Sequence, residues 1–300
     1  MSGFREVRQD LGMIPRVEDG WTFLYVEHRQ VHQDAFGIRL VSEMGVIQVP
    51  ISQIKVLMIG PGVSVTSAAM LAMSDHGCSV VWVGENGVRF YGSAQPATNK
   101  SDNLARQARM WVDPKENSRV VRRMYVQRYG ESFPESDNLA VLRGHEGVRV
   151  KHVYMTEATR LGLTWKGRNW VLGGWDVTDK MNRCLSVASS CLYGLCHAVI
   201  VAIGFSPGLG FIHTGDLRSF VLDVADMYRE KFTIPVAFAI AATCGSDKAD
   251  GATRKACRDA FNSLNLVGQI VPDIYEVLGL ARVGASFIDI AAWEALRPKA

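Results

Sequence analysis

The sequence predicts an α+β protein, in which a strand-rich N-terminal domain (residues 1–95) precedes a larger, all-helical C-terminal domain (residues 96–300). Three observations support this fold class. Short runs rich in Val, Ile, Tyr, Phe and Trp, divided by Asp, Gly and Pro, fill residues 21–92. Small and polar residues, typical of a linker, follow directly. Beyond them, apolar residues recur at helical spacing over long stretches.

The N-terminal domain is expected to consist of short strands and one small helix. The expected strands cover residues 21–28, 36–41, 45–50, 55–59, 79–83 and 88–91. Residues 66–76 carry a run of Ala, Leu and Met that predicts a helix. Exposed strand edges in such a domain favour pairing with another copy of the chain.

The C-terminal domain is expected to be built from helices alone. Residues 185–205 are long and weakly polar, but Ser186, Tyr193 and His197 favour a helix buried by protein over a membrane span. The first expected helix follows residues 101–103 and ends near residue 111. The others are expected to cover residues 117–129, 136–161, 179–204, 216–230, 235–242 and 249–278.

Composition is that of a globular, cytoplasmic protein. Of the 300 residues, 48% are apolar, which is enough for a sizeable core. Because 33 basic and 30 acidic residues nearly balance, polyanion binding through bulk charge is excluded. Six cysteines show no C-x-x-C pair and no zinc-like spacing, so they are expected to be buried, reduced thiols. Residues 1–8 lack the apolar core of a signal peptide.

The strongest chemical signal lies in residues 211–226. Asp216 is expected to cap a helix that begins at the next residue. On that helix Asp223 and Asp226 share one face, and His213 lies just before it. A shared cation relieves the repulsion between two carboxylates, and this donor set favours Mg²⁺ or Mn²⁺. The alternative is a solvated Asp-x-x-Asp face with a loop histidine.

A third acid, Glu146, stands between Gly144 and Gly147 in the third expected helix. Glycine destabilises a helix by about 1 kcal/mol relative to alanine, so the pair indicates a close approach at this point. Either a packed neighbouring helix or a phosphate near a metal held by Glu146 explains it.

Residues 101–130 carry seven basic side chains against three acidic ones, a local excess of +4. Such a run forms either an ordinary solvated helix face or a phosphate-binding surface. In the second case, DNA affinity falls steeply with salt.

Taken together, these motifs resemble the CRISPR-associated adaptation integrase, the Cas-one family, in its subtype I-E form. The similarity spans nearly the whole chain, apart from about twenty residues at each end. It is carried by residues 143–149, 182–194, 208–215 and 220–226, and in the first half by residues 61–66 and 81–91.

The resemblance implies a metal-dependent DNA endonuclease and integrase that inserts new spacers into a CRISPR array by attack of a 3′-hydroxyl on a phosphodiester. The family's metal ligands fall on Glu146, His213 and Asp226, with Asp223 as the neighbouring catalytic carboxylate. Tyr193 matches a tyrosine that lines the site, and the family position at Asn182 supports it. One-ion and two-ion schemes both fit.

The resemblance also places the DNA contacts. Trp170 and Trp175 fall where this subtype reads the protospacer-adjacent motif. His28 stands where the family carries a tyrosine that wedges apart the duplex end, and an imidazole can also stack on a base. The basic side chains expected to contact DNA are Arg89, Arg122, Arg123, Arg229, Arg254 and Arg258.

The implied partners are double-stranded DNA with single-stranded ends and CRISPR repeat DNA. A homodimer is expected through the first domain, with two such dimers flanking a dimer of the second adaptation protein, the Cas-two family. From the residues alone two alternatives stay open. One is a DNA-binding scaffold without catalysis. The other is an enzyme for a small substrate such as a sugar phosphate, although the glycines at 60–62 and 208–210 are too few to diagnose a phosphate loop.

Overall fold

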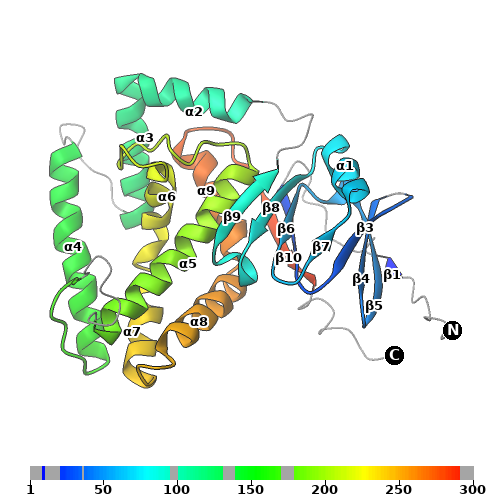
Figure 1. The fold of residues 1–300 in the computed structure, drawn as a ribbon. Helices are drawn as coiled ribbons and strands as arrows, with labels where there is room; N and C mark the ends of the chain where they lie inside the picture. Colours follow the sequence, from blue (N-terminus) through cyan, green and yellow to red (C-terminus); the bar gives the residue numbers. More distant parts are fainter. Residues whose placement is uncertain are drawn as a thin grey trace.

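A computed structural model describes residues 9–10, 21–35, 37–94, 101–130, 139–169 and 179–290. A strand-rich N-terminal region is followed by a helical region, so the predicted fold class is confirmed (Figure 1). The expected motif readers Trp170 and Trp175 lie outside the described residues.

The first sheet has the strand order β1-β5-β4-β3-β7. Its centre is an antiparallel meander in which Val31 pairs with Leu40 and Leu40 pairs with Ile47. The sequence had not predicted β3. The strands are β1 (Gln9–Asp10), β3 (Gln30–Asp34), β4 (Gly37–Ser42), β5 (Gly45–Pro50) and β7 (Ser64–Val65).

The second sheet has the order β10-β2-β6-β8-β9 and is parallel except between β8 and β9. Two short 3₁₀ turns and the helix α1 connect the strands of the two sheets. The strands are β2 (Trp21–Val26), β6 (Val56–Ile59), β8 (Ser79–Val83), β9 (Phe90–Ala94) and β10 (Ala285–Asp289); the connectors are η1 (Ile51–Gln53), α1 (Ser67–Asp75) and η2 (Glu85–Gly87).

Strand β10 corrects the prediction that residues 96–300 are helical throughout. After the last helix the chain returns to the N-terminal region, where β10 pairs with β2 in parallel, from Ala285 opposite Trp21 to Asp289 opposite Tyr25. The five-residue run carries no turn signal or repeated alternation that sets it apart from the helical segments before it.

The second sheet is the central layer of the molecule, because its strands β2 and β6 are buried on both faces. Along β2, Phe23 and Tyr25 belong to the core shared with the helices. The alternate residues Leu24 and Val26 belong to a second core under the first sheet and α1. The period-2 alternation of a strand thus joins the two parts of the protein.

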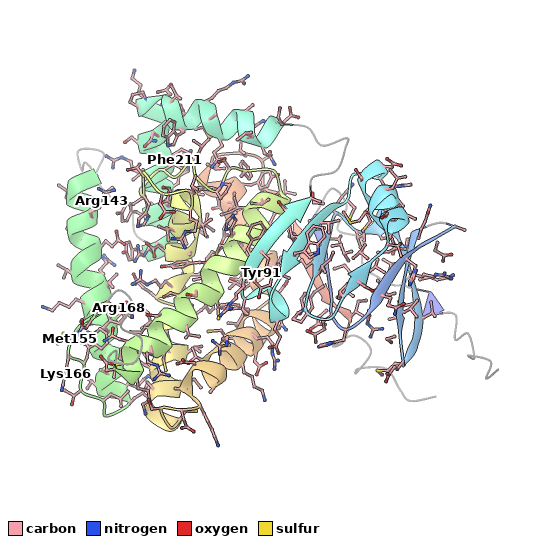
Figure 2. All side chains as sticks on the ribbon, viewed as in Figure 1. Tyr91, Arg143, Met155, Lys166, Arg168 and Phe211 are labelled. Carbon is pink, nitrogen blue, oxygen red and sulfur yellow. The ribbon has the colours of Figure 1, made fainter. Side chains whose placement is uncertain are left out.

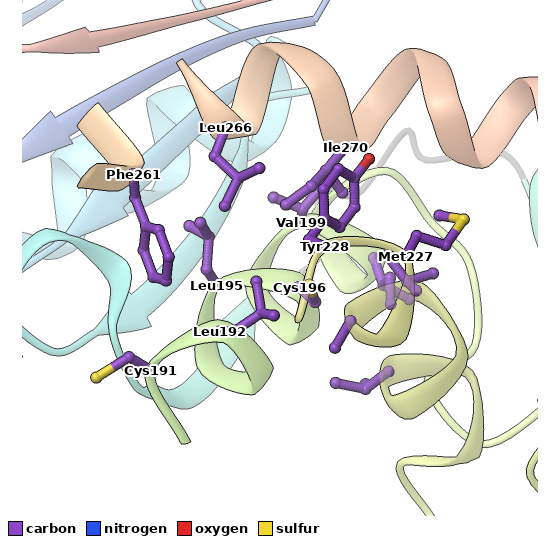
Figure 3. Packing of buried hydrophobic residues seen from close by; sticks show 14 of the residues in the cluster. Cys191, Leu192, Leu195, Cys196, Val199, Met227, Tyr228, Phe261, Leu266 and Ile270 are labelled. Carbon is purple, nitrogen blue, oxygen red and sulfur yellow. The ribbon is translucent and has the colours of Figure 1, made fainter. Parts of the chain in front are cut away.

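Helix α5 is the centre of the helical region. It contacts α6, α7, α8 and α9 on one side and β8 and β9 on the other, and Figure 3 shows Leu192, Leu195 and Val199 of α5 packed beside Ile270 and Leu266. The helices are α2 (Asp102–Val112), α3 (Pro114–Tyr129), α4 (Leu139–Arg160), α5 (Lys180–Ala202), α6 (Ser219–Arg229), α7 (Thr233–Thr243), α8 (Ala249–Ser263) and α9 (Leu266–Val277).

The apolar helix predicted to be buried is α5. By length and composition it is the one helix in the described part of the chain that could cross a membrane, yet 67% of its apolar window is buried inside the protein. The expectation of a core helix is therefore confirmed. All six cysteines are unpaired, and only Cys244 is more than marginally accessible.

Two helix boundaries differ from the prediction. Helix α6 begins at Ser219 rather than after Asp216, because the Asp216 carboxylate accepts the backbone N–H of Arg218 in a local turn. The single helix expected over residues 249–278 is broken at Asn265, whose φ of 46° is left-handed. Asn tolerates this conformation better than most residues, so α8 and α9 form two helices.

Candidate functional site

The loop that precedes α6 is anchored on one buried carboxylate. Asp223 is 1% exposed and accepts the backbone N–H groups of Phe211 at 2.5 Å, Ile212 at 3.1 Å and His213 at 2.8 Å. Backbone donors stabilise a buried carboxylate in its charged form. The main chain thus already stabilises the charge of Asp223, and a cation shared between Asp223 and Asp226 stays a prediction.

The same carboxylate orients His213. Its ring Nδ1–H donates to Asp223 Oδ1 at 2.8 Å, which leaves Nε2 3.8 Å from Asp226 Oδ2. The hydrogen bond with Asp223 raises the pKa of His213 above its ordinary value; burial opposes this, and the charges of Asp223, Asp226 and Glu146 add to it. A histidine fixed through Nδ1 presents Nε2 as its free ligand atom.

Glu146, on α4, is held by side chains rather than by backbone. Arg128 Nη1 lies 2.5 Å from Glu146 Oε1, and the Tyr125 hydroxyl donates to Oε2 at 3.0 Å. Arg128, on α3, also binds Glu230 Oε1 through Nη2 at 2.6 Å and Nε at 3.1 Å. Glu146 is thus tied to α3 and, through Arg128, to the end of α6.

The structure places His213 Nε2 3.8 Å from Asp226 Oδ2 and connects Glu146 to this pair through electrostatic interactions. The Glu146 charge acts on His213, and the Glu146 and Asp226 charges both act on Arg128. Near Glu146, the Arg143 guanidinium donates to the Ile212 carbonyl, and Figure 2 shows Arg143 on α4 beside the loop of Phe211. Among the residues the structure describes, however, no three His, Cys, Asp or Glu side chains are already grouped to hold a metal ion.

Asp226 is paired with a cation from its own helix. Arg229 Nη1 lies 3.3 Å from Asp226 Oδ1, and its Nη2 donates to the Tyr154 hydroxyl at 2.8 Å. Arg229, predicted to contact DNA, is therefore engaged inside the site.

A basic cavity of about 480 Å³ lies beside the acids. Tyr193 connects the two, because it lines the cavity and its pKa is raised by burial and by the Asp226 charge, with Arg229 opposing. Three serines of α5 also face this space. The cavity is lined by Arg89, Arg168, Arg218, Arg254, Tyr193, Ser186, Ser189 and Ser190, with Val88, Val187 and Cys191.

Two features of α5 shape this cavity. Asn182 binds the incoming segment, since its Oδ1 accepts from Arg168 Nη1 at 3.2 Å and its Nδ2 donates to the Gly167 carbonyl at 3.1 Å. At Gly194 a Cβ would lie 2.5 Å from the Arg89 Cα, so only glycine lets the helix approach this strand end. Both features thereby fix segments that carry residues of the cavity lining, Arg168 and Arg89.

The predicted DNA contacts separate into two groups. Arg89 and Arg254 line the cavity, and Arg122 lines a hollow of about 310 Å³. Arg123 and Arg258 have structural partners instead: Arg123 Nε donates to the Val277 carbonyl at 2.7 Å, and Arg258 pairs with Glu85 at 2.5 Å and Asp259 at 2.9 Å.

His28 is exposed in the turn between β2 and β3. Its φ of 50° lies in the left-handed region, and its ring lies over Gly62, where a Cβ would meet Nδ1 at 2.5 Å. Strain of this kind is common where a side chain must be presented for a function.

Sequence reasoning missed several residues that build the site. Gln107 on α2 is fully buried; it donates to the Ser206 and Leu209 carbonyls at 3.0 Å each and accepts the Ser206 N–H at 2.7 Å. Trp111, one turn later, donates to the Gly210 carbonyl at 2.9 Å. Helix α2 thus holds the loop of His213, although about a hundred positions separate them in sequence and no spacing signal joins them.

Gly144 and Gly147 on α4 face open space. Within the described part of the chain, a Cβ added at either position would have no neighbour within 4 Å. Of the two explanations for these glycines, close packing by one of the described helices is therefore wrong. The α4 face beside Glu146 is open.

Sequence comparison identifies relatives over most of the chain. Residues 24–132 and 124–254 match the family model described as CRISPR associated protein Cas1. A Thermus thermophilus protein named CRISPR-associated endonuclease Cas1 2 is 40% identical over 266 residues, which are 89% of this chain and 82% of that protein. CRISPR-associated endonuclease Cas1 of Escherichia coli is 36% identical over 274 residues, 91% of this chain and 89% of that protein.

Comparison with solved structures leads to the same family. The crystal structure titled TtCas1-DNA complex has a TM-score of 0.83 at 40% identity and covers 88% of this chain and 99% of that chain. A casposase bound to an integration product, with a TM-score of 0.61 at 12% identity over 88% of this chain and 97% of that one, shares the fold. The two-part fold is that of the CRISPR-associated endonucleases. The chain belongs to the Cas1 family.

Proposed function

We propose that this protein is a metal-dependent DNA endonuclease and integrase that inserts new spacers into a CRISPR array by 3′-hydroxyl transesterification. One observation carries the proposal: His213 Nε2 lies 3.8 Å from Asp226 Oδ2, and the charge of Glu146, eighty positions before Asp226, acts on the same histidine. The names of the relatives as endonucleases and the DNA complex of one of them support it.

The donor set fits Mg²⁺ or Mn²⁺, since the two carboxylates are hard oxygen ligands and only one ligand is an imidazole. His213 Nε2 and Asp226 Oδ2, 3.8 Å apart, are close enough to share one ion, and Glu146 supplies the third ligand. When bound, the ion would offset the negative charge that develops on the phosphate oxygens.

The chain's own residues prepare the site for this chemistry. Asp223 is a positioning residue, because it fixes the tautomer of His213 and the loop that carries it. Arg229 holds the Asp226 carboxylate, and Tyr193, which lines the cavity, interacts electrostatically with Asp226.

The cavity is proposed to bind a single-stranded DNA end. Arg89, Arg168, Arg218 and Arg254 offer four guanidinium groups for phosphates, and Tyr193 offers a face for a base. The open α4 face at Gly144 and Gly147 leaves space for the duplex. Affinity for DNA is expected to fall steeply with salt.

The assembly is proposed to follow subtype I-E, on the motifs quoted above. A homodimer would form through the strand-rich region, where Met44 and Leu71 are 79% and 63% exposed. Two dimers would flank the second adaptation protein and hold CRISPR repeat DNA.

The test is a strand-transfer assay with Mn²⁺ or Mg²⁺ on Glu146→Gln, His213→Gln and Asp226→Asn. Each variant is expected to lose about a hundredfold or more in rate, because several kcal/mol of transition-state stabilisation depend on the ion. DNA binding should persist, since arginines supply it. Glu157→Gln, also on α4 but paired with surface Arg160, is the matched control. Wild-type rates in the Glu146 and Asp226 variants would refute the assignment.

A DNA-binding scaffold without catalysis is the second candidate. The ion pairs of Glu146 with Arg128 and of Asp226 with Arg229 favour it, because both carboxylates already have a cation from the chain itself. Mn²⁺ titration separates the two candidates, because a scaffold retains DNA without binding the ion.

A further inference from the structure

The cation that Glu146 binds in this structure is the guanidinium of Arg128. Only 5% of the Arg128 side chain is exposed, and both of its carboxylate partners are largely buried, Glu146 at 21% and Glu230 at 16% exposure. Contacts between buried charges at 2.5 and 2.6 Å are strong and geometrically specific. Arg128 therefore occupies the carboxylate that the proposed function assigns to a divalent ion.

The charge of Arg128 also acts on the other side of the site. Burial lowers the pKa of Arg128, but the Asp226 and Glu146 carboxylates raise it above its ordinary value. Two of the three proposed ligands are thus stabilised by one internal cation, which offsets the repulsion between them.

The two contacts of Arg128 are unequal. Nε and Nη2 both donate to Glu230 Oε1, whereas Nη1 alone donates to Glu146. Release of Glu146 therefore breaks one contact and leaves Arg128 in an ion pair with Glu230. The Tyr125 hydroxyl still donates to Glu146 Oε2, so Oε1 is the oxygen set free.

We propose that Arg128 is an internal counter-cation that holds Glu146 in the metal-free protein, and that Glu230 retains it when a divalent ion takes Glu146. This inference rests on the proposed function and deepens it. Arg128 and Glu230 are positioning residues that set the metal affinity through competition for one carboxylate. The two have opposite effects: Arg128 opposes metal binding, and Glu230 favours it.

The test measures Mn²⁺ affinity without DNA, from the electron paramagnetic resonance signal of free Mn²⁺. Arg128→Gln is expected to bind Mn²⁺ about tenfold more tightly, because a competing charged hydrogen bond is removed. Glu230→Gln is expected to bind about tenfold more weakly, because Arg128 loses its alternative carboxylate. Arg119→Gln, also on α3 but 66% exposed and paired with Glu116, should match the wild type.

Shifts of the same sign in the two variants, or affinities equal to that of Arg119→Gln, would overturn the inference. If Arg128→Gln fails to fold, the test relies on Glu230→Gln, in which Arg128 is still present. Mn²⁺ binding by Glu230→Gln that is tighter than, or equal to, that of the wild type is then sufficient to overturn the inference. If Glu146→Gln binds Mn²⁺ as tightly as the wild type does, the metal assignment and this inference are both overturned. Binding that depends on Glu146 but not on Arg128 or Glu230 overturns this inference alone.

Discussion

The two sides of the acid–histidine site are built differently. On the α6 side, Asp223 binds three consecutive backbone N–H groups and the ring of His213. On the α4 side, the partners of the Glu146 carboxylate among the described residues are the side chains of Arg128 and Tyr125. One half of the site is fixed by the main chain, and the other half can exchange partners.

This difference separates stability from function. A group that satisfies buried backbone donors cannot leave without exposing them, so Asp223 is expected to matter most for folding. A carboxylate held by a guanidinium can change partners by rotating one side chain, so Glu146 is expected to matter most for cation binding. The division can be tested in the metal-free protein.

Asp223→Ala should have the largest effect on stability. Two buried N–H groups and the partly buried N–H of His213 lose their acceptor at about 1–3 kcal/mol each, so the free energy of unfolding should fall by about 3–9 kcal/mol. Urea denaturation measures this. A loss of under about 1 kcal/mol would show that the loop does not depend on Asp223.

Gln107→Leu should come next. The Ser206 and Leu209 carbonyls and the Ser206 N–H lose a fully buried partner, which should cost about 2–4 kcal/mol. Hydrogen exchange should rise in residues 206–213 more than in α4. Equal exchange in both segments would contradict a role for α2 in holding this loop.

Glu146→Gln should destabilise the protein less than either variant, by about 1–2 kcal/mol. Arg128 keeps two contacts to Glu230, and the amide oxygen still accepts from Tyr125. The measurement is the thermal unfolding of Glu146→Gln and of Asp223→Ala under the same conditions. If the Glu146 variant proves the less stable of the two, the division between a fixed and an exchangeable half is wrong.

The smallest effect is that of pH through His213. Because its folded pKa is raised, its contribution to stability is complete below the unfolded value, about 6.5, and is lost as pH rises through the folded value. Its side chain is 39% exposed, so solvent screens the effect. Wild type should exceed His213→Gln in unfolding free energy by more at about pH 6 than at about pH 8.5. A constant difference would contradict the raised pKa.

Local periodicity was sufficient to predict that His213, Asp223 and Asp226 share one volume. It could not predict what Asp223 binds, because three backbone N–H groups become available only once the loop has folded back onto α6. The role of Arg128 could not be predicted from the sequence either, because its two carboxylate partners lie 18 and 102 positions away, on α4 and at the end of α6. The resemblance placed Glu146 in the site, and the structure explains its present partner.

The sequence predicted elements that depend on a local residue pattern better than elements that depend on pairing with a distant segment. The buried helix α5 followed from its composition, whereas the break at Asn265 depended on one residue tolerating a left-handed φ. Strand β10 depends on a partner more than 260 positions earlier, and no local signal encodes such pairing.

The position of β10 at one edge of the central sheet has a consequence for biosynthesis. A ribosome releases the first strands early, but β2 gains its neighbour on one side only after residue 289 has been made. Until then the nascent chain displays an unpaired, apolar edge, the kind of surface that chaperones bind and that aggregates form on. Maturation of this protein is thus coupled to synthesis of the distant segment that carries β10.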